Sequence, residues 1–544
     1  MSIIVPPGHS HLPSRRESRR DDGRASGTSD AGDAIGGYPW TPDRGDGTYR
    51  NPILFADYSD PDVVRVGDDF FLTASSFNCT PGLPILHSRD LVNWKIVNHA
   101  IRQVPDARYE RVQHGCGVWA PSIRHHDGRF WIFFPTPDEG IYVTTADDPR
   151  ERWSEPRMVV AGNGLIDPCP LWDDDGKAYL VFAYAHSRSG LKHQLRVCPM
   201  ASDASRLLGD GQVVFRDEAR HPTMEGPKFH KRDGWYYILA PAGGVATGWQ
   251  VALRSRQVYG PYEPRIVLER GATSVNGPHQ GALIDSPDGR EWWFVHFQEM
   301  LPYGRIVHLQ PATWRDGWPM IGIDQDGNGI GEPVAQHRKP MNSAGPPPCV
   351  PQSSDEFDSP QLGLQWQWHA NHKPAWYSLD ARPGWLRLNA QPLPAPDRSL
   401  PEYPALLLQK FPAMRFATET RVELHADSLA VRAGLAVVGL SCASLSTRRE
   451  GQLQQVVLQI NGENVAAADV SLGAVTLRIH VSDGGACRFE FTETGSVAQA
   501  IGDTFKATEG KWIGAKIGVF CASDSDVATD AHADFDYVRL SRAD

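Results

Sequence analysis

Three acidic residues stand in apolar, proline-containing segments, where limited contact with water can shift the pKa of a carboxyl group. They are Asp60 before Pro61, Asp167 before Pro168, and Glu225 in Glu225-Gly226-Pro227. Hydrolysis of a glycosidic bond requires two carboxyl groups, one protonated to donate to the leaving oxygen and one ionised to activate water or attack. An acid in such a segment is, taken alone, more often a turn or strand-end residue than a catalytic one. Whether the three acids act together therefore depends on the secondary-structure elements that position them.

A short pattern recurs five times along the chain. Each copy has a glycine beside a polar residue in a turn, followed by a run rich in aromatic and β-branched residues. The copies are Gly67-Asp68-Asp69-Phe70-Phe71, Asp127-Gly128-Arg129-Phe130-Trp131, Asp175-Gly176-Lys177-Ala178-Tyr179, Asp233-Gly234-Trp235-Tyr236-Tyr237 and Asp288-Gly289-Arg290-Glu291-Trp292-Trp293. The glycines step by 61, 48, 58 and 55 residues. Repeats of about 50 residues with several short strands each are typical of β-propeller blades, so the spacing predicts a five-bladed propeller.

The propeller brings the three acids together. Asp60, Asp167 and Glu225 each precede the glycine turn of a different repeat, at what we take to be the same blade position. In a propeller that position is the innermost strand, so three blades would direct their acids into one axial pocket. This convergence favours a catalytic role for the set over three separate turn acids.

The rest of the chain is divided by composition. Residues 1–45 are polar and charged and predict a disordered tail, residues 46–340 hold the propeller, and the proline-rich residues 341–352 form a linker. Polar and apolar residues alternate in 455–460 and 475–480, a pattern of strands with one solvated face. Residues 353–544 are therefore predicted to be a β-sandwich of jelly-roll, lectin-like type, which makes the whole protein all-β.

Charge and cysteine content exclude some classes of partner. The net charge is −11 and no run of apolar residues is long enough to span a membrane, so neither nucleic acid nor a membrane is an expected partner. The eight cysteines lack metal-binding or paired spacing and no signal peptide is recognisable, which predicts free thiols and a cytoplasmic location. Paired arginines near the N-terminus keep a periplasmic location as the alternative, and a homo-oligomer is left open.

These motifs resemble a known enzyme family. Residues 48–340 resemble glycoside hydrolase family 43, and the C-terminal part resembles the β-xylosidase C-terminal domain of that family. The first resemblance rests on Asn51-Pro52-Ile53-Leu54, Asp60-Pro61-Asp62, Trp119-Ala120-Pro121-Ser122, Ile166-Asp167-Pro168 and Glu225-Gly226-Pro227. The second rests on Asp355-Glu356-Phe357-Asp358, Leu364-Gln365-Trp366-Gln367-Trp368 and Ala533-Asp534-Phe535-Asp536-Tyr537.

The resemblance implies a role for each of the three acids. Asp60 matches the general base that activates water, and Glu225 matches the general acid that protonates the leaving oxygen. Asp167 matches a third carboxylate that raises the pKa of the acid and orients it, because a neighbouring negative charge disfavours ionisation. The family inverts anomeric configuration, and an inverting pair is expected about 6.5–9.5 Å apart.

The resemblance also implies sugar-binding and metal-binding residues. Arg305 matches a sugar-binding arginine, Phe77 and Trp119 match aromatic walls of the sugar pocket, and His279 matches an inner histidine that lies near an axial calcium or water cluster in parts of the family. In the sandwich, a structural calcium is expected at Asp355 and Asp536, with strand-end acids as the alternative. Hydrolysis itself requires no cofactor.

The expected substrate is a xylo-oligosaccharide or an arabinose-substituted one. The xylosidase-type C-terminal domain favours an enzyme that releases terminal xylose from β-1,4-xylo-oligosaccharides. An α-L-arabinofuranosidase or a bifunctional enzyme remains the alternative, because the loop after Phe77 departs from the best-known xylosidases. A non-catalytic carbohydrate-binding protein and a protein-interaction propeller rank below both, since all three acids are present.

Overall fold

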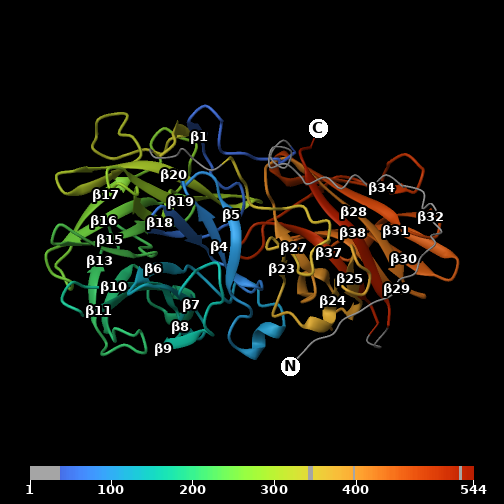
Figure 1. The fold of residues 1–544 in the computed structure, drawn as a ribbon, viewed down its shortest axis with the longest axis horizontal. Helices are drawn as coiled ribbons and strands as arrows, with labels where there is room; N and C mark the ends of the chain where they lie inside the picture. Colours follow the sequence, from blue (N-terminus) through green and yellow to red (C-terminus); the bar gives the residue numbers. More distant parts are fainter. Residues whose placement is uncertain (1–36, 341–346, 396–397, 526–529, 544) are drawn as a thin grey trace, which may run out of the picture.

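Two all-β units lie side by side in the computed structural model (Figure 1). It describes residues 37–340, 347–395, 398–525 and 530–543. The propeller, in blue to yellow-green, carries the N-terminal half of the chain, and the sandwich, in orange to red, carries the C-terminal part. Among the described helices, none has the length and apolar character needed to cross a membrane.

The propeller consists of five antiparallel sheets of four strands each, in which the strands follow one another in chain order. The first three sheets are β2 (Asp62–Val66), β3 (Asp69–Thr73), β4 (Gly82–Ser88) and β5 (Lys95–Ile101); β6 (Ser122–His126), β7 (Arg129–Thr136), β8 (Gly140–Ala146) and β9 (Arg157–Ala161); and β10 (Leu165–Trp172), β11 (Ala178–Tyr184), β12 (Gln194–Met200) and β13 (Gln212–Arg216). The last two are β14 (Lys228–Arg232), β15 (Trp235–Ala242), β16 (Trp249–Ser255) and β17 (Glu263–Leu268); and β18 (His279–Asp285), β19 (Trp292–Met300), β20 (Gly304–Arg315) and β21 (Trp318–Ile321).

The repeated glycines form the hairpin between the first and second strand of each blade. Gly67, Gly128, Gly176, Gly234 and Gly289 all have φ between 60° and 80°, a left-handed conformation that glycine adopts without steric cost. The apolar runs that follow them become the second strands, which are buried between neighbouring blades. The prediction of five blades is therefore confirmed.

The ring closes between the first and the last blade. Strand β2 packs against β18, and β1 (Thr48–Arg50) pairs with β22 (Gln336–Arg338), which follows the fifth blade. Asn51 fastens this closure, because its amide donates to the carbonyl oxygens of Leu309 and Val334 and accepts from the Leu309 N–H, each at 2.8 Å. The first strands of most neighbouring blades contact one another around the axis. The residues in these strands and directly before them therefore carry the side chains of the site.

The C-terminal unit is a sandwich of two eight-stranded sheets. One sheet contains β23 (Gln367–Trp368), β27 (Leu407–Lys410), β37 (Lys516–Ser523), β29 (Ser428–Val438), β30 (Cys442–Glu450), β31 (Leu453–Ile460) and β32 (Glu463–Val470), with β26 (Gln391–Pro392) beside β37. The other contains β24 (Tyr377–Ser378), β25 (Leu386–Asn389), β38 (His532–Ser541), β28 (Phe416–His425), β33 (Val475–Ser482), β34 (Ala486–Glu493) and β35 (Gln499–Ala500), with β36 (Phe505–Lys506) beside β34. The predicted strands at 455–460 and 475–480 are present in β31 and β33.

The two units share one hydrophobic core. Phe55, Tyr303 and Ile306 of the propeller belong to the same buried cluster as the sandwich residues. The Tyr303 hydroxyl donates to the Met414 carbonyl at 3.0 Å and accepts the Gly485 N–H at 3.0 Å. The sandwich is therefore packed on the propeller through apolar and hydrogen-bonded contacts.

The described structure begins before the predicted end of the tail. Asp43 is buried, and its carboxylate accepts hydrogen bonds from Asn93 and Lys339, each at 2.8 Å. The Trp40 indole donates to the Pro52 carbonyl at 2.9 Å. These contacts stabilise residues that local composition alone predicted to be disordered. The rest of the predicted tail, residues 1–36, and linker residues 341–346 lie outside the described residues.

Candidate active site

One cavity of about 420 Å³ at the propeller axis collects the three predicted acids. Asp60, Asp167 and Glu225 line it from the first, third and fourth blades. All four predicted sugar-binding residues line it as well, namely Phe77, Trp119, His279 and Arg305. The convergence inferred from the repeats is thus present in the structure.

The acids do not occupy strictly the same blade position. Asp60, Asp167 and Gly226 each precede a proline and have φ of 55°, 57° and 59°. Gly226 is therefore the equivalent of the two aspartates, and Glu225 stands one residue earlier. Glycine takes the left-handed conformation in the fourth blade, so the longer side chain of Glu225 reaches the cavity from a different backbone position.

Hydrogen-bond donors surround Asp60. Its Oδ2 accepts the hydroxyls of Ser59 and Ser75 at 2.7 and 2.6 Å. The Arg305 guanidinium donates to Oδ1 at 3.0 Å. An ionised carboxylate can only accept hydrogen bonds, so this arrangement suits a base. Arg305 therefore contacts the expected base in addition to lining the sugar cavity.

Asp167 and Glu225 form a coupled pair. Burial, and after it the charge of Glu225, raise the pKa of Asp167 to about 7. The Gly226 N–H donates to Asp167 Oδ2 at 2.7 Å and opposes that rise. Asp167 therefore keeps its proton to a higher pH than an exposed aspartate does, and the hydrogen bond from Gly226 limits this effect.

His279 contacts Glu225. Its Nε2 lies 3.1 Å from Glu225 Oε1, and its ring packs against Phe297 with centroids 5.5 Å apart. The imidazole is buried, whereas the Glu225 side chain is 26% exposed. This geometry indicates that His279 orients the carboxyl group of Glu225. It gives no support to a role for His279 in binding a metal.

Aromatic side chains wall the cavity, and one of them comes from the sandwich. Phe77 and Trp119 have ring centroids 6.3 Å apart, and Trp512 packs edge-on to Trp119 at 6.5 Å. Trp512 lies in the loop between β36 and β37 and is 43% exposed. The sequence analysis missed Trp512, because a loop residue in a second domain carries no repeat signal.

Asp57 links the sandwich loop to the propeller site, and it too was missed. Its Oδ2 accepts the Gly514 N–H, two residues beyond Trp512, and its Oδ1 accepts the Arg305 N–H, each at 2.9 Å. One buried carboxylate thus fixes both the aromatic wall and the arginine that contacts Asp60.

Comparison with known proteins decides the family. Residues 49–319 match the family model for glycosyl hydrolases family 43, and residues 354–541 match that for the beta xylosidase C-terminal concanavalin A-like domain. A putative beta-xylosidase from Xylanibacter ruminicola is 40% identical over 478 residues, which are 88% of this chain and 86% of that protein. The chain belongs to glycosyl hydrolases family 43.

Two further relatives agree with this assignment. A non-reducing end alpha-L-arabinofuranosidase from Bacteroides ovatus is 32% identical over 369 residues, which are 63% of this chain and 65% of that protein. The solved structure of a xylan beta-1,4-xylosidase from Bacillus halodurans is 26% identical, with a TM-score of 0.78, and covers 91% of this chain and 100% of that one. The protein is therefore a glycoside hydrolase.

The surroundings of Asp355 and Asp536 do not fit the structural calcium that was expected in the sandwich of this family 43 enzyme. Asp355 Oδ2 accepts the Trp366 indole N–H at 2.9 Å and the Gly363 N–H at 3.2 Å, and Asp536 pairs with Arg421 at 3.4 Å. Calcium is bound by oxygen atoms, whereas nitrogen donors surround these two carboxylates. The geometry favours the alternative of strand-end acids.

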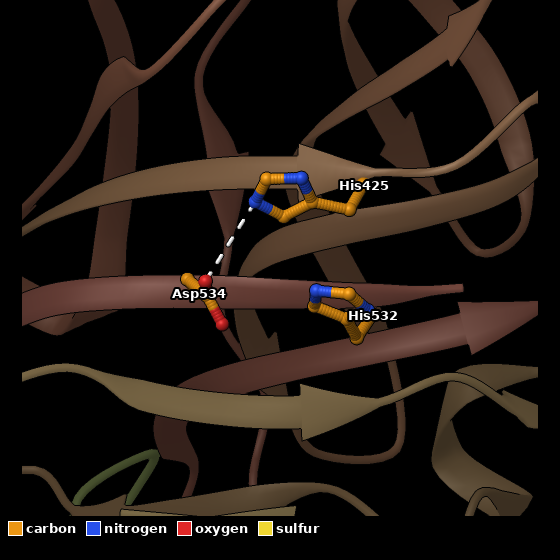
Figure 2. Close-up of side chains that lie close together, drawn as sticks. All are labelled: His425, His532 and Asp534. Carbon is orange, nitrogen blue, oxygen red and sulfur yellow. Dashed lines mark ion pairs between the residues drawn. The ribbon is translucent and has the colours of Figure 1, made fainter. Parts of the chain in front are cut away.

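Another group of metal-binding residue types lies on β28 and β38 of the sandwich and consists of His425, His532 and Asp534 (Figure 2). His425 and His532 face one another across β28 and β38, and His425 Nε2 lies 3.6 Å from Asp534. Asp534 already accepts two hydrogen bonds from Arg387, at 2.8 and 2.9 Å, and one from Arg382 at 3.2 Å. Since these guanidiniums neutralise the carboxylate, the cluster lacks the excess negative charge that would attract a divalent cation.

Proposed function

We propose that this family 43 hydrolase is an inverting, exo-acting β-xylosidase that removes terminal xylose from β-1,4-xylo-oligosaccharides. The observation that carries the proposal is the cavity itself. It holds three carboxyl groups of different environment, and Trp512 of the sandwich contributes to its wall. Because its walls come from both units, we expect the cavity to accept the end of a chain in preference to its middle.

In this mechanism Asp60 activates a water molecule and Glu225 protonates the leaving oxygen. Arg305 and the two serine hydroxyls hold Asp60 with its oxygen atoms committed to donors. Asp167 serves as the third carboxyl group and is held by the Gly226 N–H, next in the chain to Glu225, and His279 orients the Glu225 carboxyl group. Water attacks the face opposite the leaving group, so the anomeric configuration inverts.

An α-L-arabinofuranosidase, or an enzyme with both activities, is the second candidate. The arabinofuranosidase from Bacteroides ovatus supports it, with 32% identity. The two sugars can present similar hydroxyl positions, so one pocket lined by Arg305, Phe77 and Trp119 can serve both.

A reducing, cytoplasmic setting remains our proposal for the location. All eight cysteines lie in the described residues, and all are free. Free, mostly buried thiols are typical of a reducing compartment.

The test is hydrolysis of 4-nitrophenyl β-D-xylopyranoside, 4-nitrophenyl α-L-arabinofuranoside and xylobiose by the wild type and by Glu225→Gln. Proton NMR of the first product formed from xylobiose would show α-xylose for inversion. Faster cleavage of the arabinoside would favour the second candidate. Retention of configuration, or activity unaffected by Glu225→Gln, would contradict the proposed mechanism.

A further inference from the structure

A short helix of the third blade lies at the rim of the cavity. Helix α2 (His186–Ser189) follows β11, and its first two residues, His186 and Ser187, line the cavity. The next residue, Arg188, does not line the cavity, and its side chain is only 21% exposed. The guanidinium of Arg188 instead contacts the second blade and the segment that leads into it.

The Arg188 guanidinium joins three groups there. Its Nε donates to Asp138 Oδ1 at 3.3 Å, in the hairpin between β7 and β8. Its Nη2 donates to the Gly115 carbonyl oxygen at 3.5 Å. Its Cζ lies over the Trp119 ring, 5.2 Å from the centroid. A cation at this distance is attracted by the face of an indole ring, so Arg188 contacts an aromatic wall of the cavity without lining the cavity itself.

Gly115 holds Trp119 as well as Arg188. The Trp119 indole N–H donates to the same Gly115 carbonyl oxygen at 3.1 Å. This single hydrogen bond fixes one edge of the indole and leaves the ring free to tilt about that edge. The guanidinium over the ring adds a second contact that restricts the tilt, because it is tied to the same carbonyl oxygen and to Asp138.

The sandwich loop packs on the same segment. Gly115 has a φ of 70°, and a Cβ at this position would lie 2.5 Å from Lys511 Cγ and 3.1 Å from Trp512 Cδ1. Only glycine therefore fits between Trp119 and the sandwich loop without a shift of the loop. Both tryptophans of the cavity wall depend on the place of this segment, which Arg188 ties to the hairpin at Asp138.

The ion pairs of this network do not explain it through stability. Asp138 is shared between Arg188 and Arg108, at 3.3 and 3.4 Å, and Arg108 also pairs with Glu139 at 3.1 Å. The side chains of Arg188 and Asp138 are partly exposed, at 21% and 24%. Ion pairs in contact with water contribute little to stability. The orientation of Trp119 is the feature that these contacts determine.

We propose that Arg188 is a positioning residue that holds the indole of Trp119 in place as a wall of the sugar pocket. The proposal rests on the proposed function, in which Trp119 contacts the terminal sugar. Arg188 touches no sugar and acts through the ring of Trp119 and the carbonyl group of Gly115. An aromatic ring binds a sugar face best in a defined orientation, so a ring that is free to tilt binds the substrate more weakly.

Arg188→Met tests this role, because methionine removes the charge and the donors but keeps an unbranched side chain. We expect KM to rise about three- to tenfold for xylobiose and for 4-nitrophenyl α-L-arabinofuranoside. We expect kcat to stay within about twofold of the wild type, since a wall that contacts substrate and transition state alike affects binding alone. Arg129→Met is the matched control and should leave KM unchanged. Arg129 forms an ion pair with Asp147 at 3.0 Å in the same blade.

A double-mutant cycle separates positioning from a general structural role. Trp119→Ala removes the ring, so adding Arg188→Met to it should change KM by no more than about 1.5-fold. Arg188→Lys keeps a cation beside Asp138 and Trp119, and it should bring KM back to within about twofold of the wild type. Additive effects of the two substitutions, or a wild-type KM in Arg188→Met, would overturn the proposal.

A crystal structure of Arg188→Met distinguishes a failure of this inference from a failure of the proposed function. The Trp119 indole should be displaced or should occupy more than one conformation. An indole in its wild-type position overturns the inference, whatever the kinetics show. If the wild type hydrolyses neither substrate, or if Trp119→Ala has a wild-type KM, the proposed function or its sugar wall fails. The position of the indole still decides the role of Arg188 in that case.

Discussion

Two of the carboxylates in the cavity are held in backbone conformations that most side chains avoid. Asp60 and Asp167 have φ of 55° and 57°, which costs on the order of 1–3 kcal/mol for each residue. Such strain persists where the surrounding structure imposes it, and it clusters at functional sites. Pro168 lies within β10 and Pro61 directly precedes β2, so the inner strands set the direction of both side chains.

Asp60→Asn tests the role of the base. An amide cannot accept a proton from water, so we expect kcat to fall by at least about 10³-fold on 4-nitrophenyl β-D-xylopyranoside and on xylobiose alike. Asp127→Asn is a matched control, because Asp127 has φ of 50° in a hairpin remote from the cavity. Equal activity of both variants would contradict the assignment.

Asp167→Asn tests the electrostatic cost of the coupled pair through stability. The pKa of Asp167 is raised from 3.8 to about 7 in the folded state, so its stabilising contribution is present below about pH 4 and is lost as the pH rises through about 7. Asparagine escapes this loss and can still accept the Gly226 N–H. We therefore expect the variant to be inactive yet more stable than the wild type at pH 8, by on the order of 2–4 kcal/mol.

The measurement is urea denaturation of both proteins at pH 4 and at pH 8. At pH 4 the native Asp167 is protonated and the carboxyl group of the unfolded chain is only partly ionised, so the two proteins should differ little. A stability gain that is the same at both pH values would show that the raised pKa is not its source.

Among the elements, the two-stranded closure of β1 and β22 holds the ring together. Asn51 makes three hydrogen bonds with backbone groups, two with Leu309 in β20 of the fifth blade and one with Val334 beyond that blade, at a place where the first and fifth blades meet. A propeller without closure would splay its inner strands, and the acids they carry would separate. The closure therefore affects catalysis only by keeping the three acids at the right distances from one another.

Asn51→Ala should lower the free energy of unfolding by about 2–4 kcal/mol, because it leaves buried backbone groups without partners. Urea denaturation followed by tryptophan fluorescence measures the change. Asn464→Ala, at an exposed position on β32, removes one surface hydrogen bond and should cost less than about 1 kcal/mol. Similar costs for the two variants would argue against a closing role for Asn51.

At the scale of the molecule, the catalytic cavity belongs to both units. Asp57 of the propeller joins Gly514 of the sandwich to Arg305, and Tyr303 reaches into the sandwich core. The sandwich thus supplies one wall of the cavity. A change in how the sandwich packs on the propeller would therefore also change the geometry of the active site.

Trp512→Ala should weaken substrate binding without unfolding the protein. Trp512 is 43% exposed and lies in a loop outside the buried clusters, but it walls the cavity beside Trp119. We expect KM for xylobiose to rise about tenfold, since stacking on an aromatic ring is worth about 1 kcal/mol or more, with a melting temperature within about 2 °C of the wild type.

Steady-state kinetics and thermal unfolding provide the readouts. Leu440→Ala, at an exposed position of the sandwich, is the control and should leave both quantities unchanged. A wild-type KM in Trp512→Ala would exclude the sandwich loop from substrate binding.

The features that the sequence determined by itself are local turns and motifs that recur along the chain. The five glycine turns require positive φ within a few residues, and their spacing predicts the blades before any contact is known. The same repeat places Asp60, Asp167 and Glu225 together, although it does not reveal the one-residue offset of Glu225. Phe77, Trp119, His279 and Arg305 followed from family motifs, and all of them line the cavity.

Only the tertiary structure decided how the site is completed. Asp57 and Gly514 are 457 residues apart in the chain, and His279 and Glu225, which come from different blades, are 54 residues apart. Neither the place of Trp512 in the cavity wall nor the nitrogen donors around Asp355 can be predicted from the local sequence. Contacts of this kind depend on which segments the fold brings together, because charge and burial are properties of the neighbours of a residue and not of its position in a motif.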